Sequence, residues 1–240
     1  MNVVKISLAI VVTLLFSQII HAQNGLVGNG QVIKQQRTIG SFNKLAVRVG
    51  MRVRIVAGDA TKADLEGESN VLEHVITNVK NGELTVMLSE KQTFKQTKTV
   101  TVTIHVANLN RILVSTGCSV ESDIPIQSES LATTVETGSR LITAITTKKL
   151  DLTVKEGSQA NLKGTATVAD IHLSGAGKLQ AEKLTITQAT IQLDGASRAD
   201  IHVTETLSAS ADGVSTINYT GNPTVKSQDA TGLSKIRKQS

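Results

Sequence analysis

Two aspartates occupy matching places in a repeated phrase of this sequence and could hold a cation. Asp194 and Asp212 each stand directly before a glycine, and Glu156 has the same place in an earlier repeat, although Ser174 interrupts the series. If successive repeats stack at the spacing of β-strands, about 5 Å, Asp194 and Asp212 lie one above the other, and their repulsion would suit Ca²⁺. Asp before Gly is also ordinary turn chemistry. We expect turn residues here, with a calcium site as the alternative.

The cysteine and the histidines are too dispersed to predict a metal or catalytic centre. Cys118 is the only cysteine, and we expect a small, half-buried turn residue, with an intermolecular disulfide and a nucleophile as alternatives. No Gly-x-Ser-x-Gly elbow, phosphate-binding loop or dinucleotide fingerprint is present. The histidines beyond residue 22 lack the close partners of metal sites, and we expect them on solvent-facing strand positions: His74, His105, His172 and His202. We therefore predict no catalytic residue, no metal ligand and no cofactor.

The glycines that follow these acids belong to a repeat that runs from about residue 110 to residue 219. Each copy has alternating apolar residues, a polar residue, the glycine, a small residue and a second alternating apolar leg. Successive central glycines are 21, 19, 18, 20 and 18 residues apart. The copies centre on Thr116-Gly117-Cys118, Thr137-Gly138-Ser139, Glu156-Gly157-Ser158, Ser174-Gly175-Ala176, Asp194-Gly195-Ala196 and Asp212-Gly213-Val214.

This repeat predicts a parallel β-helix. A leg of four to six residues cannot bury its apolar face alone, but stacked on the next coil it extends one continuous core. Glycine at each corner permits positive φ and close packing of successive coils. The near absence of aromatic residues, 2% of the chain, fits a narrow core of stacked aliphatic side chains. An antiparallel sandwich of evenly spaced hairpins is the alternative.

The half of the chain before the repeats also alternates with period two, which predicts a more irregular β-sheet region. The apolar alternation is clear at 45–49 and again at 100–106. Asn81-Gly82 between two such runs is a strong hairpin signal. A helical turn is expected only at 70–74.

Domain organisation follows from composition along the chain. Residues 1–22 have the charged start, the apolar centre and, before Gln23, the cleavage site of a secretory signal peptide, with a retained anchor as the alternative. No later stretch has the length of a transmembrane helix. Residues 23–40 are expected to be a flexible lead-in with a short strand at Val32-Ile33. Residues 41–232 form one domain, with the regular glycine-turn repeats at 116–225. Residues 233–240 form a basic tail.

Charge and aromatic content argue against nucleic acid as a partner. The net charge of +5 comes from 25 basic and 20 acidic residues that are scattered along the sequence, except in the tail. A solvated surface is therefore expected rather than a nucleic-acid or anionic-membrane patch. Beyond residue 22 the only aromatic residues are Phe42, Phe94 and Tyr219, too few for base-stacking platforms.

The residues described so far resemble a known family. The glycine turns, the opening 41–45 followed by 53–55, and the segment Ile217-Asn218-Tyr219-Thr220-Gly221-Asn222-Pro223 are similar to the putative auto-transporter adhesin, head GIN domain family. The resemblance covers residues 41–232. It implies a right-handed parallel β-helix with an irregular N-terminal sheet region, and an exported protein of the periplasm, the outer-membrane surface or the extracellular space.

The function expected from the sequence is non-enzymatic. We expect a secreted or cell-envelope module with an adhesive or structural role, and a surface glycan or an envelope protein as its partner. A carbohydrate-active enzyme, either a lyase or a hydrolase, on the same scaffold is the alternative, and it would need a cluster of carboxylates on one face. End-to-end self-association of open solenoid ends is also left open.

Overall fold

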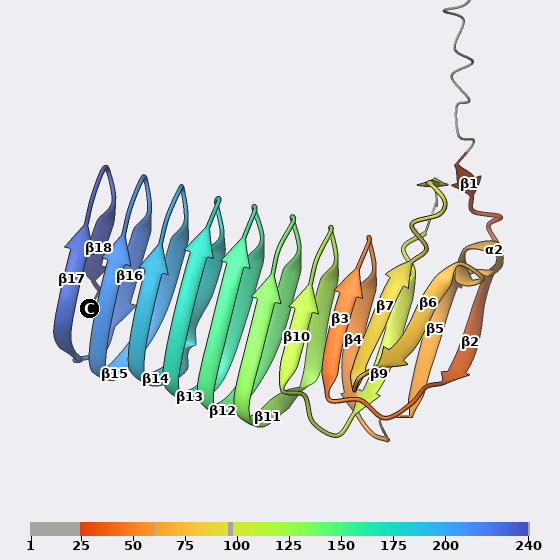
Figure 1. Cartoon of the computed structure of the whole chain (residues 1–240), viewed down its shortest axis with the longest axis horizontal. Helices are drawn as coiled ribbons and strands as arrows, with labels where there is room; N and C mark the ends of the chain where they lie inside the picture. The colour runs from red at the N-terminus through yellow and green to blue at the C-terminus, as the bar shows by residue number, and fades with distance from the viewer. Residues whose placement is uncertain (1–24, 60, 96–97, 240) are drawn as a thin grey trace, which may run out of the picture.

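The computed structural model describes residues 25–59, 61–95 and 98–239, and these form a β-solenoid (Figure 1). The fold class predicted from the repeat, a parallel β-helix with an irregular N-terminal sheet region, is confirmed. The predicted signal peptide lies outside the described residues. No helix in the described ranges combines the length and the apolar character needed to cross a membrane.

Each regular coil is a flattened loop of two legs. A first leg follows a sharp glycine corner, the chain then bends, and a second leg runs to the next corner. Most coils are a single bent strand: β11 (Ser119–Val135), β12 (Arg140–Lys155), β13 (Gln159–Ser174), β14 (Lys178–Leu193) and β15 (Arg198–Ala211). The last coils are divided into β16 (Thr216–Thr220), β17 (Thr224–Ala230) and β18 (Lys235–Lys238). Neighbouring coils pair in parallel, so the first legs form one sheet and the second legs another.

The core between the two sheets consists of aliphatic side chains stacked in register. One such row is fully buried and contains Leu141, Ala160, Leu179, Ala199 and Ile217. Each buried Leu or Ile contributes about 1.5–3 kcal/mol relative to exposure. Because large and small residues alternate along the row, the two sheets can lie close together without voids.

The chain doubles back at the N-terminal end of the stack. β3 (Lys44–Arg48) and β4 (Arg52–Ala57) form one coil, which pairs with β10 (Arg111–Val114) and the start of β11 on one side. On the other side it pairs in parallel with β7 (Glu83–Leu88) and β9 (Thr101–Val106). The chain therefore leaves this coil, builds strands beyond it, and crosses back over it to begin the regular repeats.

Antiparallel strands end the parallel stack at this N-terminal end. β5 (Lys62–Glu68) pairs with β9, and β6 (Val75–Lys80) pairs with β7 across the predicted Asn81-Gly82 hairpin, where both φ angles are positive. The predicted helical turn is the short helix α2 (Ser69–Leu72), which joins β5 to β6. These outer strands turn the irregular region into a cap on the solenoid.

The expectation of a flexible lead-in at 23–40 is wrong for most of this segment. β2 (Val32–Thr38) pairs along its whole length with β5, and β1 (Leu26–Val27) pairs with β8 (Phe94–Lys95). The backbone N–H of Gly30 donates to Glu68 Oε1 at 2.7 Å. The side chains of β2 are almost all exposed, because the strand is held by backbone pairing and not by an apolar face. The alternation of apolar residues therefore could not predict this strand.

The segment expected to be a basic tail, 233–240, contributes the final strand of the solenoid, so the stack extends beyond the expected domain boundary at residue 232. β18 pairs with β16, and the Tyr219 carbonyl accepts the N–H of Gln239 at 2.8 Å. Inward positions of this last coil carry polar residues where earlier coils carry apolar ones: Gln228 aligns with Ala209, and Lys238 aligns with Tyr219. Such polar substitution is typical of terminal repeats.

The corner glycines adopt the geometry expected from their spacing. The φ angles of the six central glycines lie between +53° and +76°. The residue before the glycine also has positive φ in three corners, those at Thr116, Thr137 and Glu156. Asn and Asp tolerate this conformation better than Thr and Glu, so the stacking of coils, and not local preference, holds these three corners.

Glycine is required more strictly at the bend residue Gly164 than at the corner residue Gly138. A Cβ built on Gly164 (φ +110°) would overlap the carbonyl oxygen of Ile145 in the adjacent coil, whereas a Cβ on Gly138 (φ +66°) meets no atom within 4 Å. We predict that Gly164→Ala lowers the free energy of unfolding by about 3 kcal/mol or more, because the coils must separate. The control Gly138→Ala should cost only the strain of positive φ, about 1 kcal/mol. Urea denaturation checks both, and equal losses would contradict the distinction.

Candidate functional site

A row of buried hydroxyl groups runs inside the sharp corners and was not anticipated from the sequence. The backbone N–H of Ser139 donates to Ser158 Oγ at 3.1 Å. Further along, the N–H of Ser197 donates to Ser215 Oγ at 3.4 Å, and the N–H of Ser215 donates to Ser234 Oγ at 3.1 Å. We call this row the serine ladder. It gives the buried N–H groups of these three corners a partner in the next coil.

Cys118 takes the place of a serine in this ladder. The N–H of Met51 donates to Cys118 Sγ at 3.4 Å, and the N–H of Cys118 donates to Ser139 Oγ at 3.2 Å. The side chain is 2% exposed and therefore fully buried, not half-buried as expected. Its position at a turn was correct, and its structural role is to accept the hydrogen bond that serine accepts elsewhere.

The ladder is interrupted at Gly177, for a steric reason. A Cβ at this position would overlap the carbonyl oxygen of Val154, so serine cannot fit. The N–H of Ser158 therefore donates within its own corner, to the Lys155 carbonyl at 3.2 Å, and the N–H of Gly177 donates to the Ser174 carbonyl at 3.0 Å. Each buried N–H still has a partner, as the cost of leaving one unpaired requires.

The ladder predicts which substitutions the corners tolerate. Ser215→Ala should lower the free energy of unfolding by about 1–2 kcal/mol, because the buried N–H of Ser197 loses its acceptor. Cys118→Ser should change stability by less than about 0.5 kcal/mol, since serine already fills this position in other coils. Urea denaturation of both variants is the measurement. A larger loss from Cys118→Ser than from Ser215→Ala would contradict the ladder.

The environment of Cys118 argues against a reactive thiol. Burial raises the pKa of the thiol to about 11, although hydrogen bonds from the Met51 and Gly50 N–H groups and the charge of Arg48 act to lower it. The thiolate is the nucleophilic form, and a raised pKa makes it scarce at neutral pH. A nucleophilic role therefore has no support from the site.

We predict that native Cys118 resists alkylation. At pH 8 its thiolate population should be about a hundredfold lower than that of a thiol with the ordinary value of 9.0, and burial slows access further. The rate of iodoacetamide labelling, followed by mass spectrometry, should rise about tenfold per pH unit up to about pH 11. The same chain unfolded in urea is the control. Equal labelling rates for the native and unfolded chains would contradict the burial of Cys118 and the raised pKa of its thiol.

The acids before the corner glycines are each engaged by a neighbouring coil. Glu156 Oε2 accepts the Thr137 hydroxyl at 2.7 Å, and Asp212 Oδ1 accepts the Thr231 hydroxyl at 2.5 Å. This hydrogen bond, followed by one from the Gly213 N–H, holds the pKa of Asp212 below its ordinary value. Asp194 lies 3.6 Å from His172 Nε2. Their contacts are those of turn residues, and within the described ranges no three or more His, Cys, Asp or Glu side chains gather as a metal group.

The four histidines contact different parts of the solenoid and do not meet. His74 packs edge-on against Phe94, and His202 Nδ1 lies 2.8 Å from the Thr220 hydroxyl. His105 Nε2 lies 2.9 Å from Asp64 Oδ2, a pair that sequence reasoning missed. No local motif marks the pair, since it arises from the antiparallel alignment of β5 with β9.

The Asp64–His105 pair borders an open hollow of about 470 Å³ on the outer surface of β2, β5 and β9. Its lining includes two carboxylates, Asp64 and Glu66, which are side by side on one face of β5. Hydrogen bonds from Gln36 and then His105 hold the pKa of Asp64 below its ordinary value. The general acid of a glycosidase needs a raised pKa, whereas the pKa of Asp64 is lowered. Asp64 therefore does not have the property of such an acid.

A comparison with family models shows to which family the chain belongs. The model described as "Putative auto-transporter adhesin, head GIN domain" matches residues 41–223, which span most of the chain. The chain belongs to this family. The resemblance drawn from the glycine turns and from residues 217–223 is thereby confirmed.

Solved structures share the fold of this head GIN domain. A putative adhesin from Bacteroides fragilis NCTC 9343 is 22% identical with a TM-score of 0.84, over 90% of this chain and 100% of that chain. A putative adhesin from Parabacteroides merdae ATCC 43184 is 18% identical with a TM-score of 0.72, over 90% and 99%. A putative lipid binding protein from Parabacteroides distasonis ATCC 8503 is 14% identical with a TM-score of 0.71, over 90% and 99%. Among proteins of curated function, none matches the sequence significantly.

The broadest surfaces of the head GIN domain are the two outer faces of the solenoid. On each face, exposed side chains from successive coils stand in register, about 4.8 Å apart. On the first legs, Gln180 accepts hydrogen bonds from Gln159 at 3.1 Å and from Asn161 at 3.4 Å. Rows of polar groups on a rigid, flat sheet can contact an extended partner at many points, which makes these faces the candidate binding site.

Proposed function

We propose that this protein is a non-enzymatic adhesion module of the bacterial cell surface or envelope. Its outer faces bind an extended partner through many weak contacts. The observation that carries the proposal is the in-register stacking of exposed polar side chains on two flat faces. Membership of a family described as adhesin supports the same role and an envelope or surface location.

The rigidity of the solenoid supports a binding role. Every coil is hydrogen-bonded to its neighbours along both legs, and its inward side chains are buried. A surface that is already ordered loses little conformational entropy when a ligand binds. Many contacts of small energy can then add to a useful affinity.

The enzymatic alternative has weaker support. Polysaccharide hydrolysis needs one carboxyl group held protonated near a second carboxylate. Asp64 and Glu66 are neighbours on β5, but the pKa of Asp64 is lowered, and Lys34 Nζ lies 3.9 Å from Glu66 Oε2. Asp64 is thus stabilised in its charged form, and neither contact is that of a carboxyl group held protonated for catalysis.

Binding of the purified protein to cell-surface material tests the proposal. We predict saturable retention on isolated envelope fractions and on a subset of an immobilised glycan array, measured by biolayer interferometry. The variant Asp64→Asn is the matched control, because it removes the acid that hydrolysis would need and leaves the solenoid faces intact. It should bind as the parent chain does.

Two results would contradict the proposal. One is the absence of retention on every surface. The other is the release of reducing or unsaturated sugar from a polysaccharide by the parent chain and not by Asp64→Asn, which would establish the enzymatic alternative.

A further inference from the structure

The two outer faces of the regular coils differ in charge. From β12 onward, the first legs carry eight Lys or Arg, of which Lys238 is at an inward position, and two Asp or Glu, whereas the second legs carry three of each. The first leg of β11, which lies before them, carries two acids, Glu121 and Asp123. The glycine corners between the legs contain three acids, Glu156, Asp194 and Asp212, and no Lys or Arg. We call the outer side of the first legs the basic face; these legs are residues 140–145, 159–164, 178–184, 198–203, 216–220 and 235–238. The second legs are residues 149–155, 168–174, 188–193, 206–211 and 224–230.

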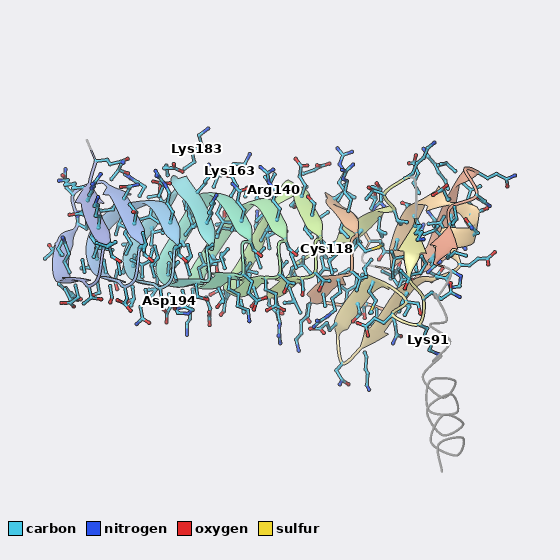
Figure 2. The ribbon with its side chains drawn as sticks, turned by 90° about the horizontal axis from the view of Figure 1, so that it is seen from above. Lys91, Cys118, Arg140, Lys163, Lys183 and Asp194 are labelled. Carbon is cyan, nitrogen blue, oxygen red and sulfur yellow. The ribbon has the colours of Figure 1, made fainter. Side chains whose placement is uncertain are left out.

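Stacking brings cations that are distant in sequence into rows on the basic face. Figure 2 shows Arg140, Lys163 and Lys183 on one side of the solenoid and Asp194 on the opposite side. One row follows the strand register and combines four cations with two neutral polar residues: Arg140, Gln159, Lys178, Arg198, Thr216 and Lys235. No acid interrupts this row, and the Lys and Arg side chains in it are exposed.

Like charges stand directly beside each other at two places on this face. Lys178 aligns with Arg198, and Lys163 aligns with Lys183. Side chains aligned in this way on neighbouring strands lie about 5 Å apart, where like charges repel and destabilise the sheet. The arrangement therefore does not serve the stability of the isolated fold. An anion placed between these side chains would relieve the repulsion.

Most of these cations have no acidic partner. In the ranges that the structure describes, Arg140, Lys163, Lys178 and Lys183 form no salt bridge within 4.0 Å. Arg198 is the exception and binds Asp200 through two nitrogens, at 2.9 and 3.0 Å.

The acids of the basic face do not cancel its charge. Burial raises the pKa of Asp200, but hydrogen bonds from Arg198 and Asn218 outweigh it, and the pKa is lowered overall. Asp200 is thus an ionised partner of Arg198. The other acid on these legs, Glu182, is exposed beside Lys183. The cations that carry no ion pair outnumber this single remaining acid.

We propose that the basic face binds a linear acidic polysaccharide that lies across the coils. The inference rests on the proposed adhesion function and names its ligand class. Carboxylate or sulfate groups along the chain pair with Arg140, Lys163, Lys178 and Lys183. Sugar hydroxyls hydrogen-bond to the amides between these cations, among them Asn161 and Gln180. Contacts recurring over several coils give avidity to weak individual pairs.

The surface chemistry favours a polysaccharide over other polyanions. Single-stranded nucleic acid needs aromatic platforms, and the basic face has none exposed, since its one aromatic residue, Tyr219, is 8% exposed. Peripheral binding to a bilayer gains from apolar side chains that enter the interface. Among the described residues, the large apolar side chains that are exposed all lie outside the basic face.

The test compares two variants of equal net charge. The basic-face variant carries Lys163→Gln, Lys178→Gln and Lys183→Gln. The matched control carries Lys91→Gln, Lys149→Gln and Lys226→Gln, which are exposed lysines elsewhere on the surface. Binding of each purified protein is measured against polygalacturonate, heparin, neutral dextran, single-stranded DNA and vesicles of phosphatidylglycerol. Circular dichroism and thermal melting establish that both variants are folded.

We expect the parent and the control to bind polygalacturonate or heparin and not dextran, with affinity that falls as salt is raised. The basic-face variant should lose about tenfold or more in affinity, and its salt dependence should be shallower, because it neutralises fewer anionic groups. Equal losses in both variants, or tighter binding to DNA or vesicles than to either acidic polysaccharide, would overturn the inference. Retention on neutral dextran alone, or on none of these five probes, would refute the inference. The adhesion function would fail only if the parent chain were also not retained on the envelope fractions and the glycan array.

Discussion

The parallel stacking of coils about 4.8 Å apart is the constraint on which the rest of this structure depends. Each coil must offer its backbone N–H and C=O groups to the coils on both sides, so the chain cannot shift its register without losing them. Inward side chains then stack on inward side chains, and the core is a set of aliphatic rows. Residues such as Gly164 and Gly177 mark the places where one backbone approaches the next too closely for a Cβ.

The serine ladder satisfies a second requirement of the same stacking, which is a hydrogen-bond acceptor for the buried N–H groups of the corners. A sharp corner turns backbone N–H groups toward the inside of the solenoid, where water cannot reach them. A small side chain that accepts a hydrogen bond satisfies the N–H of the preceding coil without widening the corner. Serine meets this need in several coils and Cys118 meets it in one, so the single cysteine has a structural explanation.

The outer faces are free of these packing requirements, and we propose that binding takes place there. Outward positions need only be compatible with solvent, yet the charges there are unevenly divided between the first and the second legs. Neighbouring cations such as Lys163 and Lys183 oppose stability, which favours a role in binding. The same rigid register that fixes the core holds these groups in rows, and a long ligand can meet them together.

The sequence by itself determined the repeat, the position of the corners and the class of fold. Spacing of glycines near 20 residues and alternation of apolar residues are local signals, and backbone geometry leaves few ways to satisfy them. It also determined the Asn81-Gly82 hairpin and the turn role of the residues around Asp212. The family could be recognised for the same reason, since residues 217–223 are a contiguous segment.

The features that depend on pairing between residues distant in the sequence were decided only by the tertiary structure. β2 and β18 have no apolar pattern of their own, because they are held by hydrogen bonds to strands already in place. The Asp64–His105 pair, the serine ladder and the basic face each join residues from strands that are distant in the sequence. Basic residues that look scattered in the sequence fall on the first leg of most coils, and the register of the stacked strands places them on one side.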